Sequence, residues 1–440
     1  MALTLLRKNT NHFKHKRVLV IYTSKVTNRI KYTLDFVFQQ YFGIPYEITE
    51  NPDFTGIQAN VHINYSTINH PSVFSVFQHD LLLEQDIREQ HIAVSHTSDF
   101  PVFFQTEKSF DLSFDIFSCI FYLLSRYEEY LPHEKDVHGR FPSSASLLAR
   151  QEFEFAPIVE TWLHFLKGAL KKQHPQLVFK EHRFEYLPTF DIDNAYRFLG
   201  RNWLKHPPNV FDAGCRKVLL GNWKDPFDVQ ESILPEIKTL SLQPIFFFLL
   251  NDDTQINSNV SPQSSHLHQL ILSLSDYEIG IHPSYFSSEN NTIQKEKILL
   301  ESIAERKILV SRQHFLKFSF PDTFRKLIAA GIQTDFSLGY PDVSGFRAGC
   351  SRPFYFFDLE KDAATGLLLQ PSCWMDATFV YYPSQKNNNP LANFLTIFNQ
   401  LKKINGKLVP IFHNDLLAAE MFRGIIGFIH QHLKSQGNEK

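Results

Sequence analysis

The sequence predicts an α/β protein in which a smaller α/β domain precedes a parallel βα array of the barrel type. Its 440 residues are too many for one ordinary core and indicate two domains. Seven apolar runs, separated by helix-length spacers, follow one another between residues 181 and 440. Six of these runs end at or next to a residue that can do chemistry. We therefore expect an N-terminal α/β accessory domain at 1–180 and the array at 181–440.

The first 180 residues predict a strand at 17–24 and a helix at 29–43, which Gly43 would cap. Three short strand-like runs and two long amphipathic helical patterns follow, at 46–50, 59–66, 100–105, 114–131 and 156–174. The unusual feature of this domain is the polar, aromatic segment RYEEYLPHEKDVHGRFP, at 126–142. It is either a solvated helix end and loop or a loop that reaches the cleft of the other domain.

The second part of the chain repeats one pattern, an apolar run followed by a helix-length segment. The runs lie at 183–190, 244–250, 277–282, 307–312, 332–337, 366–372 and 407–413. Strands that alternate with helical spacers predict a parallel array. The runs are nearly continuous in apolar residues, which indicates strands buried on both faces, as in a barrel.

The ends of these runs carry the residues that predict a function. They are Asp191 and Asp193, Asn251 and Asp252, His282, Arg312 and His314, Asp335, and His413. In βα barrels the active site forms at the carboxyl ends of the strands. We therefore expect these side chains, which are far apart in the sequence, to meet at one rim.

Asp193, His282 and His314 would supply one carboxylate and two imidazoles at that rim. Such a set holds a divalent metal and leaves a coordination position open. A metal in that setting lowers the pKa of water toward about 7. The alternative is that each histidine is a hydrogen-bonded core residue.

Three further residues could complete a catalytic site. Asp191 shares a strand face with Asp193 by the period of two and could take a proton from water, unless it caps the following helix. Arg312 could pair with Asp191 and keep it ionised, unless it forms a purely structural ion pair. His413 could donate a proton to a leaving group, unless it is a structural histidine at a strand end.

The motifs TFDID (189–193), EIGIHPSYFS (278–287), SRQHF (311–315), TDFSLGY (334–340) and PIFHN (410–414) occur in that order. Over 183–413 the chain resembles the polysaccharide deacetylases, the NodB-homology or carbohydrate esterase family 4 group. Two departures stand out. Ile192 separates the two aspartates, and Phe286 stands where the family's second metal histidine would fall. We expect His314 to supply the missing ligand.

The resemblance implies a distorted (β/α)7 barrel that removes an acetyl group from an N- or O-acetylated sugar or glycan precursor. It implies a divalent metal, with zinc expected, on Asp193, His282 and His314, with Asp191 as base, His413 as acid and Arg312 as the partner of Asp191. Candidates for substrate binding are Tyr285 and Trp374 as stacking residues, together with Arg347 and Asp335. The rival hypotheses are a metal-free glycoside hydrolase and a barrel that binds glycan or metal without turnover.

The composition excludes several other classes. A net charge of −2 and a pI near 6.9 do not indicate the excess of positive charge that is typical of nucleic-acid-binding proteins. The four cysteines form no CxxC pair and predict no disulfide framework. Neither a secretion signal nor a run of about 18 apolar residues is recognised, so no membrane span and a cytoplasmic location are expected.

Overall fold

The computed structural model describes residues 19–97, 100–201, 212–251, 259–386, 388–418 and 420–437. The chain divides into two compact units. Unit 1 consists of Met1–Gln85, His91–Phe121 and Leu163–Glu181, and unit 2 of Asp86–Gln90, Tyr122–Trp162 and His182–Lys440. The predicted boundary near residue 180 therefore assigns Tyr122–Trp162 to the first domain, whereas the contacts of this segment group it with unit 2.

Unit 1 is built on a parallel sheet with the order β2-β1-β3-β4. The strands are Leu19–Thr23, Tyr46–Thr49, Val61–Ser66 and Phe74–Phe77 for β1 to β4. The apolar side chains of β1 are buried, as its sequence predicts; residues 17 and 18 of the predicted strand lie outside the described part of the chain. The short β4 was not predicted.

The predicted helix at 29–43 forms as two joined pieces, α1 (Asn28–Leu34) and a π-helix (Asp35–Tyr41). Thr27 begins α1 by accepting a hydrogen bond from the Ile30 N–H through its side chain. Gly43 follows the last turn with a φ of +67°, as expected of a residue that ends a helix. Elsewhere in the first 180 residues lie β5 (Ser95–His96), β6 (Pro101–Val102), α2 (Ile116–Leu124), α3 (Leu147–Arg150) and α4 (Ile158–Gln173).

Unit 2 contains a nine-stranded sheet with the order β13-β14-β12-β11-β10-β9-β8-β17-β15. All neighbouring pairs are parallel except β13 with β14. The strands in chain order are β8 (Thr189–Ile192), β9 (Ile245–Phe248), β10 (Glu278–Ile281), β11 (Val310–Ser311), β12 (Thr334–Asp335), β13 (Phe354–Asp358), β14 (Ala363–Leu369), β15 (Trp374–Met375) and β17 (Pro410–His413). Each of the seven predicted runs contributes a strand to this sheet, and β13 and β15 are additional.

The described strands make an α/β fold with a mixed sheet, but the predicted (β/α)7 barrel is not confirmed. In the part of the chain that the structure describes, β13 and β15 stand at the two ends of the strand order and do not pair with each other. A further parallel pair, β7 (Glu185–Tyr186) with β16 (Lys407–Leu408), precedes β8 and β17 along the chain. The core of the sheet includes Ile245, Phe247, Phe336 and Val409.

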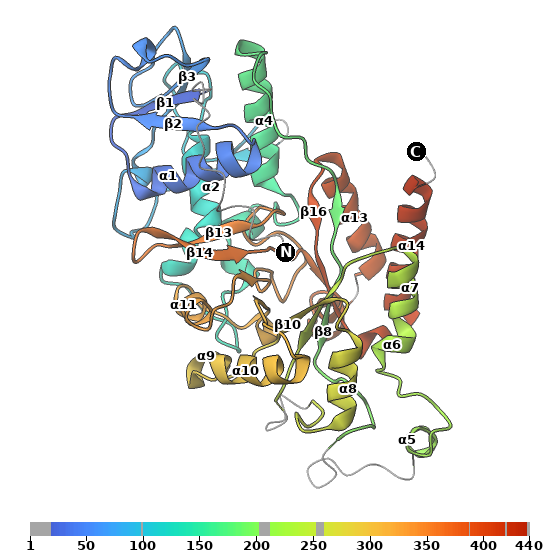
Figure 1. The fold of residues 1–440 in the computed structure, drawn as a ribbon. Helices are drawn as coiled ribbons and strands as arrows, with labels where there is room; N and C mark the ends of the chain where they lie inside the picture. The colour runs from blue at the N-terminus through green and yellow to red at the C-terminus, as the bar shows by residue number, and fades with distance from the viewer. Residues whose placement is uncertain are drawn as a thin grey trace. The chain divides into compact units, whose positions relative to one another are not determined.

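Helices occupy the connections between these strands, as parallel pairing requires. For example, α10 packs against β10 and α8 (Figure 1). The helices of unit 2 beyond residue 182 are α5 (Ala213–Leu219), α6 (Val229–Ser232), α7 (Leu234–Thr239), α8 (Ser265–Ser273), α9 (Ser287–Asn290), α10 (Ile293–Ala304), α11 (Asp322–Ala329), α12 (Asp376–Tyr381), α13 (Pro390–Lys403) and α14 (Glu420–Gly437).

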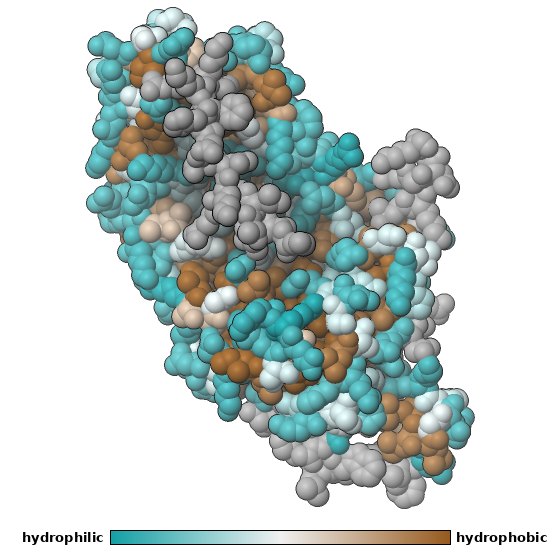
Figure 2. All heavy atoms as spheres, viewed as in Figure 1, coloured by the Kyte–Doolittle hydropathy of each residue, from teal (hydrophilic) through white to brown (hydrophobic). Residues whose placement is uncertain are grey.

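The face in Figure 2 is largely hydrophilic, with hydrophobic residues in separate patches. Among the helices that the structure describes, none has the length and hydropathy that a membrane span needs.

Candidate metal centre and cavity

The register of the sheet brings Asp191 and His413 next to each other. His413, the last residue of β17, pairs in register with Asp191 of β8. Asp193 follows β8 directly, so both aspartates lie at the carboxyl end of the same strand. His413 Nε2 is 4.0 Å from Asp191 Oδ2 and 3.8 Å from Asp193 Oδ2. The strand ends therefore converge, as the sequence predicts.

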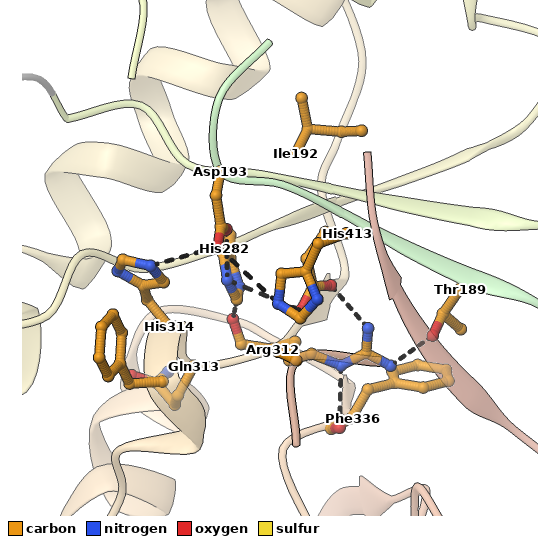
Figure 3. A network of polar contacts seen from close by, with 12 residues as sticks. Thr189, Ile192, Asp193, His282, Arg312, Gln313, His314, Phe336 and His413 are labelled. Atoms are coloured by element: carbon orange, nitrogen blue, oxygen red, sulfur yellow. Dashed lines mark hydrogen bonds and ion pairs between the residues drawn. The ribbon is translucent and has the colours of Figure 1, made fainter. Parts of the chain in front are cut away.

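Arg312 anchors Asp191 from the end of β11. Its Nη1 donates to Asp191 Oδ1 over 2.6 Å and its Nη2 donates to Thr189 Oγ1 over 2.7 Å (Figure 3). Its Nε donates to the Phe336 carbonyl at 3.2 Å, and the whole side chain is buried. A buried charge pair of this kind is costly to break, because removing one partner leaves the other uncompensated. The structure thus brings the predicted Asp191–Arg312 pair together.

Asp193, His282 and His314 form a group that could hold a metal ion. His282 Nε2 lies 3.1 Å from Asp193 Oδ1, and His314 Nε2 lies 3.4 Å from Asp193 Oδ2 (Figure 3). One ligand atom from each residue lies within 4.8 Å of the others. These are the three residues that the sequence analysis selects, including His314, which comes from a different loop than Phe286.

The hydrogen bonds around this group fit a metal. His282 Nδ1 donates to the Arg312 carbonyl over 2.6 Å, which orients the ring and leaves Nε2 available as a ligand. His282 Nε2 and Asp193 Oδ1 are both buried and lie 3.1 Å from each other, and neither makes a hydrogen bond with a third group. Buried polar atoms usually make more hydrogen bonds than this, so the pair keeps the capacity to bind a cation.

Electrostatics favours an ionised Asp193 beside these histidines. Burial alone would raise the pKa of Asp193, but His314 and His282 outweigh it and bring the pKa well below its usual value. Burial lowers the pKa of His314, which keeps its imidazole neutral and able to act as a ligand. For His282, burial opposes protonation, yet Asp191 and Asp193 raise its pKa. A bound cation would displace that proton.

His413 is held by an aspartate that sequence analysis did not pair with it. Its Nδ1 donates to Asp376 Oδ1 over 2.6 Å, and its backbone N–H donates to Asp376 Oδ2 over 2.7 Å. Burial would lower the pKa of His413, but Asp376, with help from Asp193 and Asp191, raises it to about 10. His413 is therefore protonated near neutral pH, as a proton donor must be. The only signal for Asp376 in the sequence is the acidic residue in CWMDAT.

The four residues predicted to bind substrate are not brought to the cavity beside this site. Tyr285 is buried, with its hydroxyl 2.9 Å from His138 Nδ1 and its ring under Lys317. The ring of Trp374 packs against Phe379, Phe394 and Phe412 in the core. The rings of Tyr285 and Trp374 therefore pack against neighbouring side chains and do not line the cavity.

Arg347 and Asp335 have structural partners instead. The Arg347 guanidinium is fully buried and pairs with Glu129. Asp335 accepts hydrogen bonds from the Ser311 hydroxyl at 2.7 Å and from the backbone and side chain of Ser337. Burial raises the pKa of Asp335 to about 6. Asp252, the predicted residue after β9, lies outside the described residues.

A cavity of about 770 Å³ adjoins the candidate metal group, a volume in the range of small-molecule sites. Asp191, Asp193, His314 and His413 lie in its lining. The rest of the lining includes Lys135, Asp136, Val137, His138, Arg140, Gln313, Phe315, Asp342, Tyr381, Tyr382 and Asp415. The first five come from the unusual segment at 126–142, so the hypothesis that this segment reaches the cleft is the better of the two.

Sequence reasoning missed two polar residues in this lining. Gln313 is buried and its Nε2 has no hydrogen-bond partner. Asp342 accepts from the Ser143 hydroxyl through Oδ2, while its buried Oδ1 has no partner. Tyr381, also in the lining, is 64% exposed. Gln313 lies between two residues of the predicted site, Arg312 and His314, and this was the available signal.

One family model matches part of unit 1 and the adjoining segment of the chain. Residues 19–175 match a family of unknown function, DUF7033. No curated protein matches the chain.

Several solved structures are similar to the chain over a little more than half of its length. One, from Mycobacterium smegmatis and provisionally named a polysaccharide deacetylase, is 15% identical over 59% of this chain and 94% of its own, with a TM-score of 0.38. A polysaccharide deacetylase from Bacillus cereus is 11% identical over 58% of this chain and 89% of its own, with a TM-score of 0.30. A pseudoenzyme of the carbohydrate esterase 4 family from Bacillus anthracis is 10% identical over 58% and 62%, with a TM-score of 0.29.

Proposed function

We propose that the chain is a metal-dependent hydrolase that removes an acetyl group from an N- or O-acetylated sugar or glycan precursor, with zinc as the expected ion. One observation carries the proposal. The group of Asp193, His282 and His314 is flanked by two polar pairs, Asp191 with Arg312 and His413 with Asp376. The five motifs that resemble those of polysaccharide deacetylases support the same activity.

Asp193, His282 and His314 would hold the divalent ion, which would supply Lewis-acid chemistry for the acetyl carbonyl and lower the pKa of water. The protein prepares for this by fixing the ring of His282 through the Arg312 carbonyl. Arg312 thus serves two residues, because its backbone orients His282 and its side chain orients Asp191.

Asp191 is the general base. Arg312 fixes Oδ1, and the other oxygen, Oδ2, lies 3.7 Å from His282 Nε2 and 4.0 Å from His413 Nε2. In the proposed reaction, Oδ2 accepts a proton from the water that attacks the acetyl carbon.

His413 is the general acid. The water oxygen first adds to the acetyl carbon, which becomes tetrahedral, and the carbonyl then re-forms as the bond from that carbon to the sugar nitrogen or oxygen breaks. His413 Nε2 then gives its proton to the departing atom, while Asp376 remains bonded to Nδ1. The products are acetate and a free amine or hydroxyl. Gln313, Asp342 and Tyr381 are the lining residues best suited to contact the sugar.

The test combines metal content with acetate release. Purified wild type, His282→Ala, His314→Ala and the control His266→Ala are incubated with zinc, dialysed and analysed by elemental mass spectrometry. His266 is an exposed histidine on α8 and serves as a matched control. Acetate release is then measured on chitooligosaccharides and on O-acetylated xylan. We expect one zinc ion per chain and acetate release in wild type and His266→Ala only.

Two other outcomes would favour the rivals. Zinc bound without acetate release from any acetylated sugar would support a non-catalytic barrel, the rival that Phe286 favours. No zinc in wild type would contradict the deacetylase proposal. Cleavage of a glycosidic bond in the same samples would then support the metal-free glycoside hydrolase.

A further inference from the structure

The backbone just after His314 is strained. Phe315 and Leu316 are consecutive non-glycine residues in the left-handed region, with φ of +62° and +48°. Such conformations are energetically costly and persist only where the surroundings hold them. This turn carries His314, whose Nε2 lies 3.4 Å from Asp193 Oδ2. The position of the third candidate ligand therefore depends on whatever holds the turn.

Arg140 makes a buried side-chain contact with this turn. Its Nη1 donates to the Phe315 carbonyl over 2.6 Å. Its Nη2 donates to the Tyr382 hydroxyl over 2.7 Å, and its Nε donates to Asp136 Oδ2 over 2.7 Å. The residue is 1% exposed. A planar guanidinium fixed in three directions is a rigid support, unlike a solvated side chain.

The segment that carries Arg140 is itself well ordered by hydrogen bonds. Asp136 Oδ1 accepts from the backbone N–H groups of His138 and Arg140, at 2.9 and 2.8 Å. The ring of His138 lies 5.2 Å from that of Phe315. The support for the turn thus comes from a compact loop at 136–140, which precedes the sheet of unit 2 in the chain.

We propose that Arg140 is a positioning residue for His314, holding the strained turn so that the imidazole faces Asp193 and His282. The inference rests on the proposed metal site. The hydrogen bonds of Arg140 go to Asp136, Tyr382 and the Phe315 carbonyl, so it reaches His314 through the turn and not by direct contact.

The experiment measures zinc affinity by competition with a chromophoric chelator, using the full chain. The variants are Arg140→Met, Arg140→Lys and the control Arg325→Met. Arg325 on α11 makes comparable hydrogen bonds, to Asp358 at 2.7 and 2.8 Å, but is not part of the cavity lining. We expect zinc affinity to fall about 10–100-fold in Arg140→Met, the size typical of lost support behind a ligand. Arg140→Lys should recover part of it, and Arg325→Met should match wild type.

A second readout does not need the metal. The imidazole signals of His314 are recorded by NMR in the zinc-free wild type and in both Arg140 variants. A shift of these signals, with unchanged signals for His266, supports the inference even if wild type binds no zinc, a result that would count against the proposed function only. Unchanged His314 signals, or wild-type zinc affinity in folded Arg140→Met and Arg140→Lys, would overturn it.

Discussion

Two carboxylates, Asp115 in unit 1 and Asp193 in unit 2, differ in how many hydrogen bonds they accept from the protein. In unit 1, Asp115 is fully buried and accepts five hydrogen bonds, from the Tyr65 hydroxyl, the His79, Phe117 and Ser118 N–H groups and the Ser118 hydroxyl. In unit 2, the buried Oδ1 of Asp193 lies 3.1 Å from His282 Nε2 and makes no hydrogen bond with any other group. Both units are built on parallel strands, so the type of sheet does not explain the difference between the two carboxylates. What differs is the number of hydrogen bonds that each carboxylate accepts from the protein. This number distinguishes a structural carboxylate from one that is available to a ligand.

The largest effect should follow from changing the catalytic carboxylate of unit 2. We expect Asp191→Asn to lower kcat/KM for acetate release by about 10²–10⁴-fold, because the amide cannot accept the proton from water. Zinc content should stay at the wild-type level, since Asp191 is not in the metal group. Steady-state kinetics with elemental analysis checks this. Acetate release within tenfold of wild type would remove Asp191 from the mechanism.

A smaller effect is expected at Asp335, a unit 2 residue that is satisfied internally like Asp115. Its folded pKa of about 6 lies above its usual 3.8, so the folded state holds the proton more tightly. Stability therefore falls as pH rises from about 4 to 6, by about 3 kcal/mol, and stays low above that range. In Asp335→Asn this fall should be absent. Urea unfolding of both proteins at pH 4 and pH 7 measures the difference.

If Asp335 instead binds substrate, the variant would raise KM for acetate release and leave the pH dependence of unfolding unchanged. That result would restore the prediction made from the sequence motif.

At Asp115 the comparison predicts a loss confined to stability. The Asp115→Ala substitution leaves buried hydrogen-bond donors without an acceptor. Each unsatisfied donor costs about 1–3 kcal/mol, and part of this cost is recovered when water takes the place of the carboxylate. We expect the free energy of unfolding to fall by about 2 kcal/mol, with zinc content and kcat/KM per folded chain unchanged. Denaturant unfolding and the zinc assay test this. Loss of zinc from a folded Asp115→Ala protein would contradict the division of roles between the units.

The smallest effect is expected at Asp342, whose unpartnered Oδ1 lines the cavity. Removing one hydrogen bond to a bound sugar should raise KM about tenfold in Asp342→Ala and leave kcat nearly unchanged. Asp322→Ala, at an exposed aspartate of α11, is the control. An unchanged KM would mean that the sugar does not reach this side of the cavity.

The sequence predicted the strand ends well, for a physical reason. Parallel strands bring their carboxyl ends to one edge, so Asp191, Asp193, His282, Arg312 and His413 meet as soon as the strands are recognised. His314, two residues after Arg312, is selected by the same reasoning. The departure at Phe286 led to the expectation that His314 supplies the missing ligand, which stays a prediction.

The remaining site residues could not be predicted in this way, because they do not belong to the periodic apolar patterns that identify strands and helices. Asp376 begins a helix, Asp342 lies in an irregular loop, and Arg140 comes from the first half of the chain. Their roles depend on tertiary contacts such as the one between Arg140 and the Phe315 carbonyl. Tyr285 and Trp374 were predicted from their proximity to motifs, whereas packing decided their burial.

The grouping of Tyr122–Trp162 with unit 2 has a consequence for how such a chain can be inherited. A recombination event that joined another N-terminal segment to residue 181 would keep the sheet with its aspartates and histidines. It would lose Arg140 and the other cavity-lining residues at 135–140. Conversely, residues 1–180 fused to another protein would carry these lining residues without the site that they adjoin. The interleaving of the two units along the gene therefore favours their transmission as one piece.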